Sequence, residues 1–146
     1  VHVTMLDQYT AGGIDPAQLV WIAADLAAAS KPWKIILLHR PGWSAGGGHP
    51  NDAGVQQSIQ PLAKQYGAMV VAGHNHYYAR AVVDGVTHIT TGGGGAPPVA
   101  PVLPSPNVVT AEMAYHFCII EASANTLLFR AVRLDGSDIE TFTLTR

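Results

Sequence analysis

Charged residues are scarce in this chain. Asp, Glu, Lys and Arg make up 12% of its 146 residues, where about a quarter is usual, and the formal net charge is -2. The basic residues are scattered and form neither a run nor a stripe. Because a nucleic acid partner requires a concentrated basic surface, the sequence predicts that this protein does not bind nucleic acids.

Cysteine and long apolar runs are also nearly absent. The single cysteine, Cys118, excludes an internal disulfide framework and leaves the compartment open. No run approaches the roughly 18 apolar residues of a membrane-spanning helix, so we expect no membrane partner. The low charge and the Ala, Gly and Thr content suit a cytosolic protein as well as a secreted or periplasmic one, and slightly favour the latter.

The chain also lacks an initiating Met and a signal peptide. It begins with Val1-His2-Val3-Thr4-Met5-Leu6, which already has the pattern of a strand. We therefore expect the 146 residues to be a piece of a longer gene product.

The 48% hydrophobic content is enough for the core of one domain, over residues 1–146. Its first half alternates β-type and helical patterns, which predicts an α/β fold with crossover helices. Asp15 is the expected N-cap of the first helix, with Gln18 placed to close a capping box, and Asn51 or Asp52 is the expected cap of the second. The expected strands are 2–7, 34–39 and 68–72, and the expected helices are 16–29 and 53–66.

After Arg80 the pattern changes to strands and turns. We expect a hairpin over residues 81–89, with its turn at Asp84-Gly85, and then a glycine- and proline-rich loop over 90–106. Two further hairpins over 115–144 complete a fold with α+β character at its C-terminus. The prediction is a mixed sheet with two flanking helices that continues into antiparallel hairpins.

One stretch, Gly73-His74-Asn75-His76, places two imidazoles directly after an apolar strand. In extended backbone, residues two apart point to the same side, with side-chain origins about 7 Å apart, so both imidazoles would face one metal ion or two adjacent ions. The alternative is a solvated loop with two ordinary histidines.

Two further histidines, His39 and His49, favour the metal site. His39 ends a buried strand, and ligands gather at the carboxyl ends of strands in such sheets. Neutral imidazole suits zinc, iron and manganese. Taken singly, His39 could be a buried structural residue and His49 an exposed loop residue. The remaining histidines lie inside strand patterns, where we expect structural roles: His2, His88 and His116.

In their order along the chain, these motifs resemble the calcineurin-like metallophosphoesterases, most closely the purple-acid-phosphatase-like branch. The likeness covers nearly the whole chain. It rests on Asp15-Pro16-Ala17-Gln18, the strand that ends in His39-Arg40-Pro41, His49, Gly73-His74-Asn75-His76, and the segment Thr91 to Ala96. The resemblance implies that His39, His74 and His76 are metal ligands. It also implies that His49 contacts the phosphate or protonates the leaving group.

The departure from the family is equally informative. Its members carry Asp-x-His, Gly-Asp and Gly-Asn-His motifs in a preceding half, and none of these occurs here. The chain therefore resembles the C-terminal half of a metallophosphoesterase domain, one half of its β-sandwich. We expect an apolar sheet face that requires either the missing N-terminal half or self-association.

The function that the resemblance implies is metal-dependent hydrolysis of phosphoric esters. Two divalent or trivalent ions (Fe, Zn or Mn) in the intact domain hold a hydroxide that attacks phosphorus, with His39 and His74 on one ion and His76 on the other. His49 suits proton transfer near neutral pH. Tyr77 and Arg80 are further candidates for binding the phosphate ester substrate, although residues of these types after a strand commonly pack locally.

Two alternatives remain open at this point. The chain could be a truncated or accessory, non-catalytic domain that retains only part of the metal site. It could also be a serine esterase, since Gly42-Trp43-Ser44-Ala45-Gly46 matches the Gly-x-Ser-x-Gly pattern. The flanking Arg40-Pro41 and the glycines after Ser44 disfavour the strand-to-helix turn that this motif needs. The tetrad Gly92 to Gly95 lacks the Lys-Ser/Thr of a phosphate-binding loop and is better interpreted as backbone that passes close to the site or to a strand.

Overall fold

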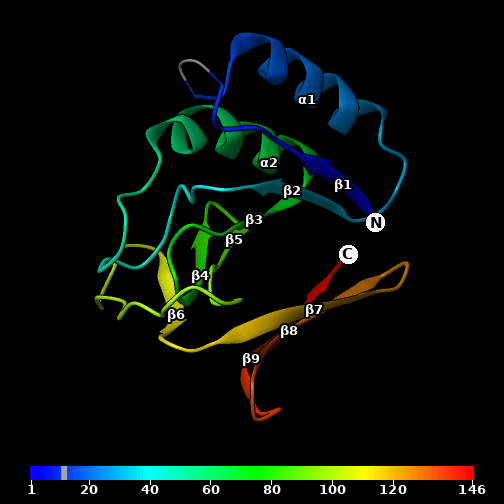
Figure 1. Ribbon diagram of the computed structural model, residues 1–146. Coiled ribbons are helices and arrows are strands. Elements are labelled where there is room, and N and C mark those ends of the chain that lie inside the picture. The colour runs from blue at the N-terminus through cyan, green and yellow to red at the C-terminus, as the bar shows by residue number, and fades with distance from the viewer. Residues whose placement is uncertain (11–12) are drawn as a thin grey trace.

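The computed structural model describes residues 1–10 and 13–146 as three stacked layers (Figure 1). Two helices form the first layer, a six-stranded sheet the second, and a three-stranded sheet the third. The elements are β1 (His2–Met5), α1 (Pro16–Ala28), β2 (Lys34–Leu38), the π-helical segment η1 (Val55–Ile59), α2 (Gln60–Tyr66), β3 (Ala68–Ala72), β4 (Tyr78–Val83), β5 (Val86–Thr91), β6 (Val108–Glu112), β7 (His116–Ala122), β8 (Thr126–Arg133) and β9 (Asp138–Thr145).

The larger sheet has the strand order β1-β2-β3-β5-β4-β6. β1, β2, β3 and β5 are parallel neighbours. β4 runs antiparallel to both of its neighbours, β5 and β6. The predicted α/β order and the predicted hairpin are both confirmed. Asp84 and Gly85 have φ values of 49° and 82°, the left-handed conformations that a tight hairpin turn requires.

A side-chain cap precedes α1 and the helical stretch that begins at Ala53, but one predicted detail is wrong. Asp15 caps α1 by accepting from Gln18 N at 2.8 Å, as expected. The Gln18 side chain does not close a capping box, because its amide pairs instead with the backbone N and O of Asp7. Of the two expected caps for the second helix, Asp52 accepts from Val55 N, whereas Asn51 binds Ser44.

Both faces of the larger sheet are packed over its central strands. On one face, buried side chains of β2 and β3 meet α1 and η1, as with Ile36, Ile22 and Ile59. On the other face, Met69 and Ile89 pack against Leu127 of β8. Figure 1 shows the helices and the three-stranded sheet on opposite sides of the larger sheet.

The C-terminal hairpins do not extend the larger sheet. β7, β8 and β9 form a separate antiparallel sheet that faces it, so this one chain builds both layers of a β-sandwich. β6 joins the larger sheet from a stretch for which the sequence predicted no strand. Hairpin patterning fixes which strands pair, but not which sheet they enter.

At the sheet edge, apolar side chains are exposed on β1. Val3 and Met5 are 52% and 69% exposed, while Thr4 between them is buried against α1. Val82 on β4 and Val109 on β6, at the opposite margin of the larger sheet, are also exposed, at 37% and 56%. None of the helices in the described residues is long and apolar enough to cross a membrane.

Candidate functional site

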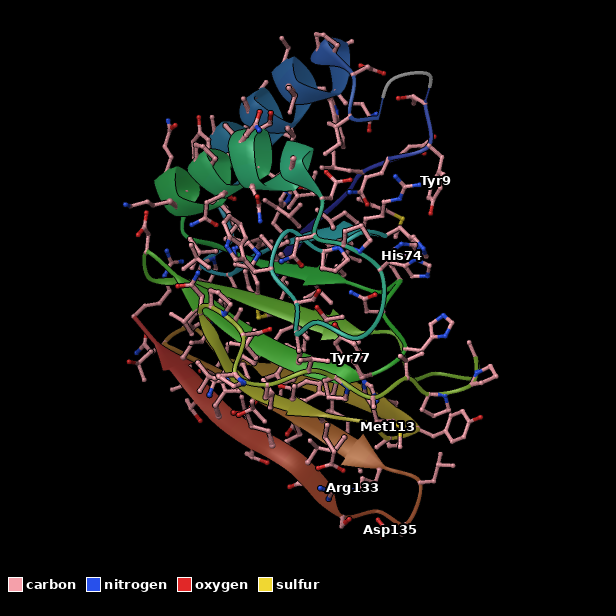
Figure 2. All side chains as sticks on the ribbon, turned by 90° about the vertical axis from the view of Figure 1, so that its left-hand side faces the viewer. Tyr9, His74, Tyr77, Met113, Arg133 and Asp135 are labelled. Atoms are coloured by element: carbon pink, nitrogen blue, oxygen red, sulfur yellow. The ribbon has the colours of Figure 1, made fainter. Side chains whose placement is uncertain are left out.

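The carboxyl ends of the parallel strands meet at one edge of the larger sheet. Gln8 lies three residues beyond β1, His39 directly follows β2, and His74 lies two residues beyond β3. Figure 2 shows Tyr9 and His74 close together on this side of the molecule. The topology alone therefore brings together residues that are more than 30 positions apart in the sequence.

Three imidazoles cluster at this edge. His39 Nε2 lies 3.0 Å from His74 Nδ1, and the ring of His49 stacks on that of His74 with centroids 4.0 Å apart. His39 and His49 are exposed, and His74 is half-buried. The cluster opens into a depression of about 480 Å³ that is lined by His39, His49, Gly73, His74, His76, Thr91, Gly92, Gly94, Gly95 and Ala96.

The backbone of the Gly-His-Asn-His stretch is not extended. His74 has φ 65°, and two tight turns join Asn75 N to Gly73 O and Tyr77 N to Asn75 O, each at 2.8 Å. The expectation that His74 and His76 face the same side through extended geometry is therefore wrong. His74 contacts His39 and His49, whereas His76 Nδ1 lies 3.1 Å from Pro97 O.

Asn75, between the two histidines, is fully buried and organises the loop that carries His49. Its Oδ1 accepts from His49 N at 2.6 Å, and its Nδ2 donates to His49 O at 3.2 Å and to Ser44 Oγ at 2.8 Å. The sequence alone did not point to Asn75. The available signal was its position between two candidate ligands, in a turn that the strand before it brings into the fold. An amide that becomes buried there needs several hydrogen-bond partners.

Ser44 belongs to the same network and has no catalytic arrangement. It is 6% exposed, and its Oγ donates to Asn51 Oδ1 while accepting from Asn75. No helix follows it directly, because the next helical residues begin at Ala53. The hydroxyl is thus committed to other partners and has no imidazole base, which removes the serine esterase alternative.

Gln8 is a second residue that the sequence did not reveal. It is 4% exposed, and its Oε1 accepts from the backbone N of His39 at 2.7 Å and of Arg40 at 2.5 Å, while its Nε2 donates to Arg40 O. Gln8 therefore fixes the segment that leaves β2 and carries His39. Its position just after a strand, at the ligand-gathering edge, was the only hint.

The surroundings of His74 favour its neutral form. Partial burial, together with the nearby His49, His39 and Arg40, lowers the pKa of His74 below its ordinary value. Arg40 stacks over the Tyr9 ring at 4.9 Å, and it helps to line a second depression of about 660 Å³ with His49, His74 and the start of the second helix. A neutral imidazole keeps the lone pair that a metal ligand needs.

The His39 and His74 nitrogens suit one shared metal ion. Two imidazole nitrogens that each bind one ion at about 2.1 Å are separated by roughly 3.0 to 3.4 Å. The observed 3.0 Å, at which the two rings share a hydrogen bond here, is compatible with that separation. Over residues 1–10 and 13–146, however, no three His, Cys, Asp or Glu side chains converge as a metal-binding group. The described residues therefore provide a pair of candidate metal ligands, His39 and His74, and His76 is not part of this pair.

The other predicted substrate residues lie elsewhere. Tyr77 is fully buried and donates its hydroxyl to Ala45 O, and burial raises its pKa. Arg80 forms a two-pronged ion pair with Glu140 across the two sheets. The structure brings neither side chain to the histidines.

The glycine tetrad divides into two pairs. A Cβ on Gly92 would lie 2.2 Å from Asn75 O, and a Cβ on Gly93 would lie 2.2 Å from His116 Nδ1. The prediction of close backbone passage is confirmed for these two. At Gly94 and Gly95 a Cβ would meet nothing within 4 Å.

Fold and site together define a two-sheet α/β domain with imidazoles at the carboxyl ends of parallel strands. No family model matches the chain. Among curated proteins it is similar to purple acid phosphatase 22 of Arabidopsis thaliana, with 32% identity over an alignment of 108 residues that covers 65% of this chain and 25% of that protein. It is also similar to acid phosphatase A of Cryphonectria parasitica, with 33% identity over 98 residues, 52% of this chain and 19% of that protein.

Two solved structures share the fold at low sequence identity. GAP50, the anchor in the inner membrane complex of Plasmodium, superposes with a TM-score of 0.78 at 20% identity, over 88% of this chain and 42% of that one. PhoD superposes with a TM-score of 0.63 at 11% identity, over 91% of this chain and 32% of that one.

The chain is related to the metallophosphoesterases, and the two curated relatives are both acid phosphatases. It spans a quarter or less of the length of each of these relatives.

Proposed function

We propose that this chain is the C-terminal part of a metal-dependent phosphoric ester hydrolase. His39 and His74 bind one metal ion, and His76 belongs to a second. The observation that supports this most directly is the 3.0 Å approach of His39 Nε2 to His74 Nδ1, at the edge where the parallel strands end. The relationship to proteins named acid phosphatases supports the class of reaction.

His49 contacts the phosphoryl group or donates a proton to the departing oxygen. Its ring is exposed and stacks on that of His74, and Asn75 binds its backbone N and O. Arg40 lines the adjoining depression together with Asp52, so a cationic side chain is within this depression, opposed by one carboxylate. Bound metal ions, Fe, Zn or Mn, would supply an activated nucleophile from water and would stabilise the charge on phosphorus.

The lack of carboxylates in the histidine depression is the reason for assigning this chain to one part of a larger domain. No Asp or Glu lines the 480 Å³ depression within the described residues. A dinuclear site needs oxygen ligands beside the imidazoles, so the N-terminal half expected from the resemblance supplies them. The partner of this chain is therefore that half, with a phosphate ester as the substrate.

The test compares the complete gene product with its His74→Ala variant. Metal content and hydrolysis of a phosphate ester should both fall sharply in the variant, because it loses a ligand of the metal pair. His2→Asn is the matched control. His2, at the start of β1, binds Asp25 on α1 and lies away from this edge. Undiminished metal content and activity in His74→Ala would overturn the proposal.

A second candidate is a non-catalytic accessory domain that works through protein contacts. The absence of a three-residue metal group within the described part of the chain favours it. Metal titration of the 146-residue chain, with and without an added N-terminal half, separates the two. Tight binding that appears only with the added half supports the hydrolase, whereas equal weak binding in both supports the accessory domain.

A further inference from the structure

An apolar pocket lies beside the histidine depression. Its volume is about 350 Å³, within the range of small-molecule sites. Its lining contains no Asp, Glu, Lys or Arg among the described residues, and consists of Gly93, Gly94, Gly95, Tyr115, His116, Phe117 and Leu134. This pocket suits an apolar or aromatic group and not an anion.

The pocket and the histidine depression share one boundary. Gly94 and Gly95 line both of them. In Figure 2, Met113, which lies two residues before Tyr115, is on the same side of the molecule as His74. A single ligand could therefore lie across the boundary, with one end at the imidazoles and the other in the apolar pocket.

Neither packing nor backbone conformation requires glycine at positions 94 and 95. A Cβ at either would meet nothing within 4 Å, and neither residue has a positive φ. Gly92 and Gly93 differ, since a Cβ at either would collide with neighbouring atoms. Because glycine has no side chain, only the backbone of Gly94 and Gly95 separates the two depressions at this boundary.

The apolar rim is exposed in this structure. Phe117 on β7 is 51% exposed, and Leu134 in the turn between β8 and β9 is 77% exposed. His116, between Tyr115 and Phe117, is held by hydrogen bonds to Ala114 O and Thr91 Oγ1, so the start of β7 is fixed. The pocket therefore offers apolar side chains on an ordered frame.

We propose that this pocket binds the alcohol part of the substrate, and that the preferred substrates are phosphate esters of aromatic or large apolar alcohols. This inference rests on the proposed function, because it assigns the phosphoryl group to the histidine depression. The two depressions then match the two chemically different ends of one ester, and Phe117 and Leu134 determine specificity.

The first experiment needs no catalysis. 2-Naphthol, the apolar part of a test ester, is titrated into the 146-residue chain while backbone amide signals are followed by NMR. Shifts should concentrate at residues 93–95 and 115–117 and at Leu134. Phe117→Ser should weaken binding by about tenfold, since it removes a ring from the contact surface. Val20→Ser, on the exposed side of α1, is the control and should bind normally.

The second experiment measures selectivity in the complete gene product. The ratio of kcat/KM for 2-naphthyl phosphate to that for glycerol phosphate should exceed one, and should fall by about tenfold in Phe117→Ser. Gly94→Val, which adds a side chain at the boundary where a Cβ has open space, should lower the same ratio. If Phe117→Ser does not fold, Leu134→Ser takes its place, since that side chain is largely exposed.

The outcomes are distinct. Hydrolysis with no preference for the naphthyl ester, or naphthol binding elsewhere, overturns the pocket and leaves the proposed function standing. Naphthol binding at the pocket without hydrolysis of any phosphate ester overturns the proposed function, and with it the assignment of the pocket to the alcohol part of a substrate. Naphthol that binds the 146-residue chain but not the complete product would show that the rest of the polypeptide covers the pocket, which also overturns the inference.

Discussion

The carboxamide of Asn75 holds the backbone of His49 from both sides, with its Oδ1 2.6 Å from His49 N and its Nδ2 3.2 Å from His49 O. The same Nδ2 reaches Ser44 Oγ at 2.8 Å. One buried side chain in the turn after β3 thus fixes the separate loop that carries His49. The imidazole cluster depends on this tie as well as on the strands.

Replacing Asn75 should therefore cost both stability and order in the His49 loop. We expect Asn75→Ala to lower the free energy of unfolding by about 3 kcal/mol, because it empties a fully buried site and removes the hydrogen bonds of Asn75 to the His49 backbone and to the Ser44 hydroxyl. Urea unfolding measures the change. Asn125→Ala, in an exposed turn, is the control and should change stability by less than about 0.5 kcal/mol. A comparable loss in the two variants would show that the amide bonds contribute little.

The glycine tetrad gives a sharper test of close packing. Gly92→Ala would place a Cβ 2.2 Å from Asn75 O, so the backbone of two segments must move apart. We expect a loss of about 2 kcal/mol or more in the free energy of unfolding. Gly94→Ala, two residues away in open space, should be nearly neutral. Equal thermal unfolding midpoints for the two variants would contradict this account.

Much of this fold follows from local sequence patterns. Asp15 and Pro16 predict where α1 begins, and Asp84-Gly85 predicts the β4–β5 hairpin, because caps and turns depend on a few neighbouring residues. The layer to which β7–β9 belong could not be predicted this way. That choice depends on contacts such as Met69 with Leu127 across the two sheets, which leave no periodic signal in either segment.

The site shows the same division. His39 and His74 could be proposed from their places after apolar strands, since strand order fixes where strands end. The left-handed φ of His74 and the supporting amides of Gln8 and Asn75 could not. These features arise from turns and long-range hydrogen bonds, whose partners lie 26 to 32 positions away in the chain. Sequence patterns therefore predict which residues reach the edge, but not how they are oriented there.

His88 should make stability depend on pH. It is 3% exposed, its Nε2 lies 2.6 Å from Gln60 Oε1, and burial lowers its pKa from 6.5 to about 4. Unfolding raises the pKa to its ordinary value, so the unfolded chain binds a proton between pH 6.5 and 4 that the folded chain does not. The stability present above pH 6.5 is lost as the pH falls toward 4, by about 3 kcal/mol in full.

The measurement for His88 is urea unfolding of the wild type and of His88→Gln from pH 7.5 to 4. Carboxylates titrate in both proteins, so the difference between them isolates His88. The wild type should lose about 3 kcal/mol more than the variant over this range. Parallel pH profiles would show that His88 does not resist protonation in the fold.

Arg80 and Glu140 should couple the two sheets. Arg80 on β4 donates to both Glu140 oxygens on β9, at 2.6 to 3.0 Å, and the two side chains are 17% and 13% exposed. Tyr78 and Thr110 donate to the same carboxylate. Arg80→Met removes the cation and leaves a largely buried negative charge, so we expect a loss of about 3 kcal/mol in the free energy of unfolding. The double variant Arg80→Met/Glu140→Gln should recover part of it, because a neutral amide can still accept from Tyr78 and Thr110.

Urea unfolding of the wild type, both single variants and the double variant gives the coupling energy. Additive losses would mean that the pair does not tie the sheets together. A changed KM with unchanged stability would instead mean that Arg80 acts on the substrate.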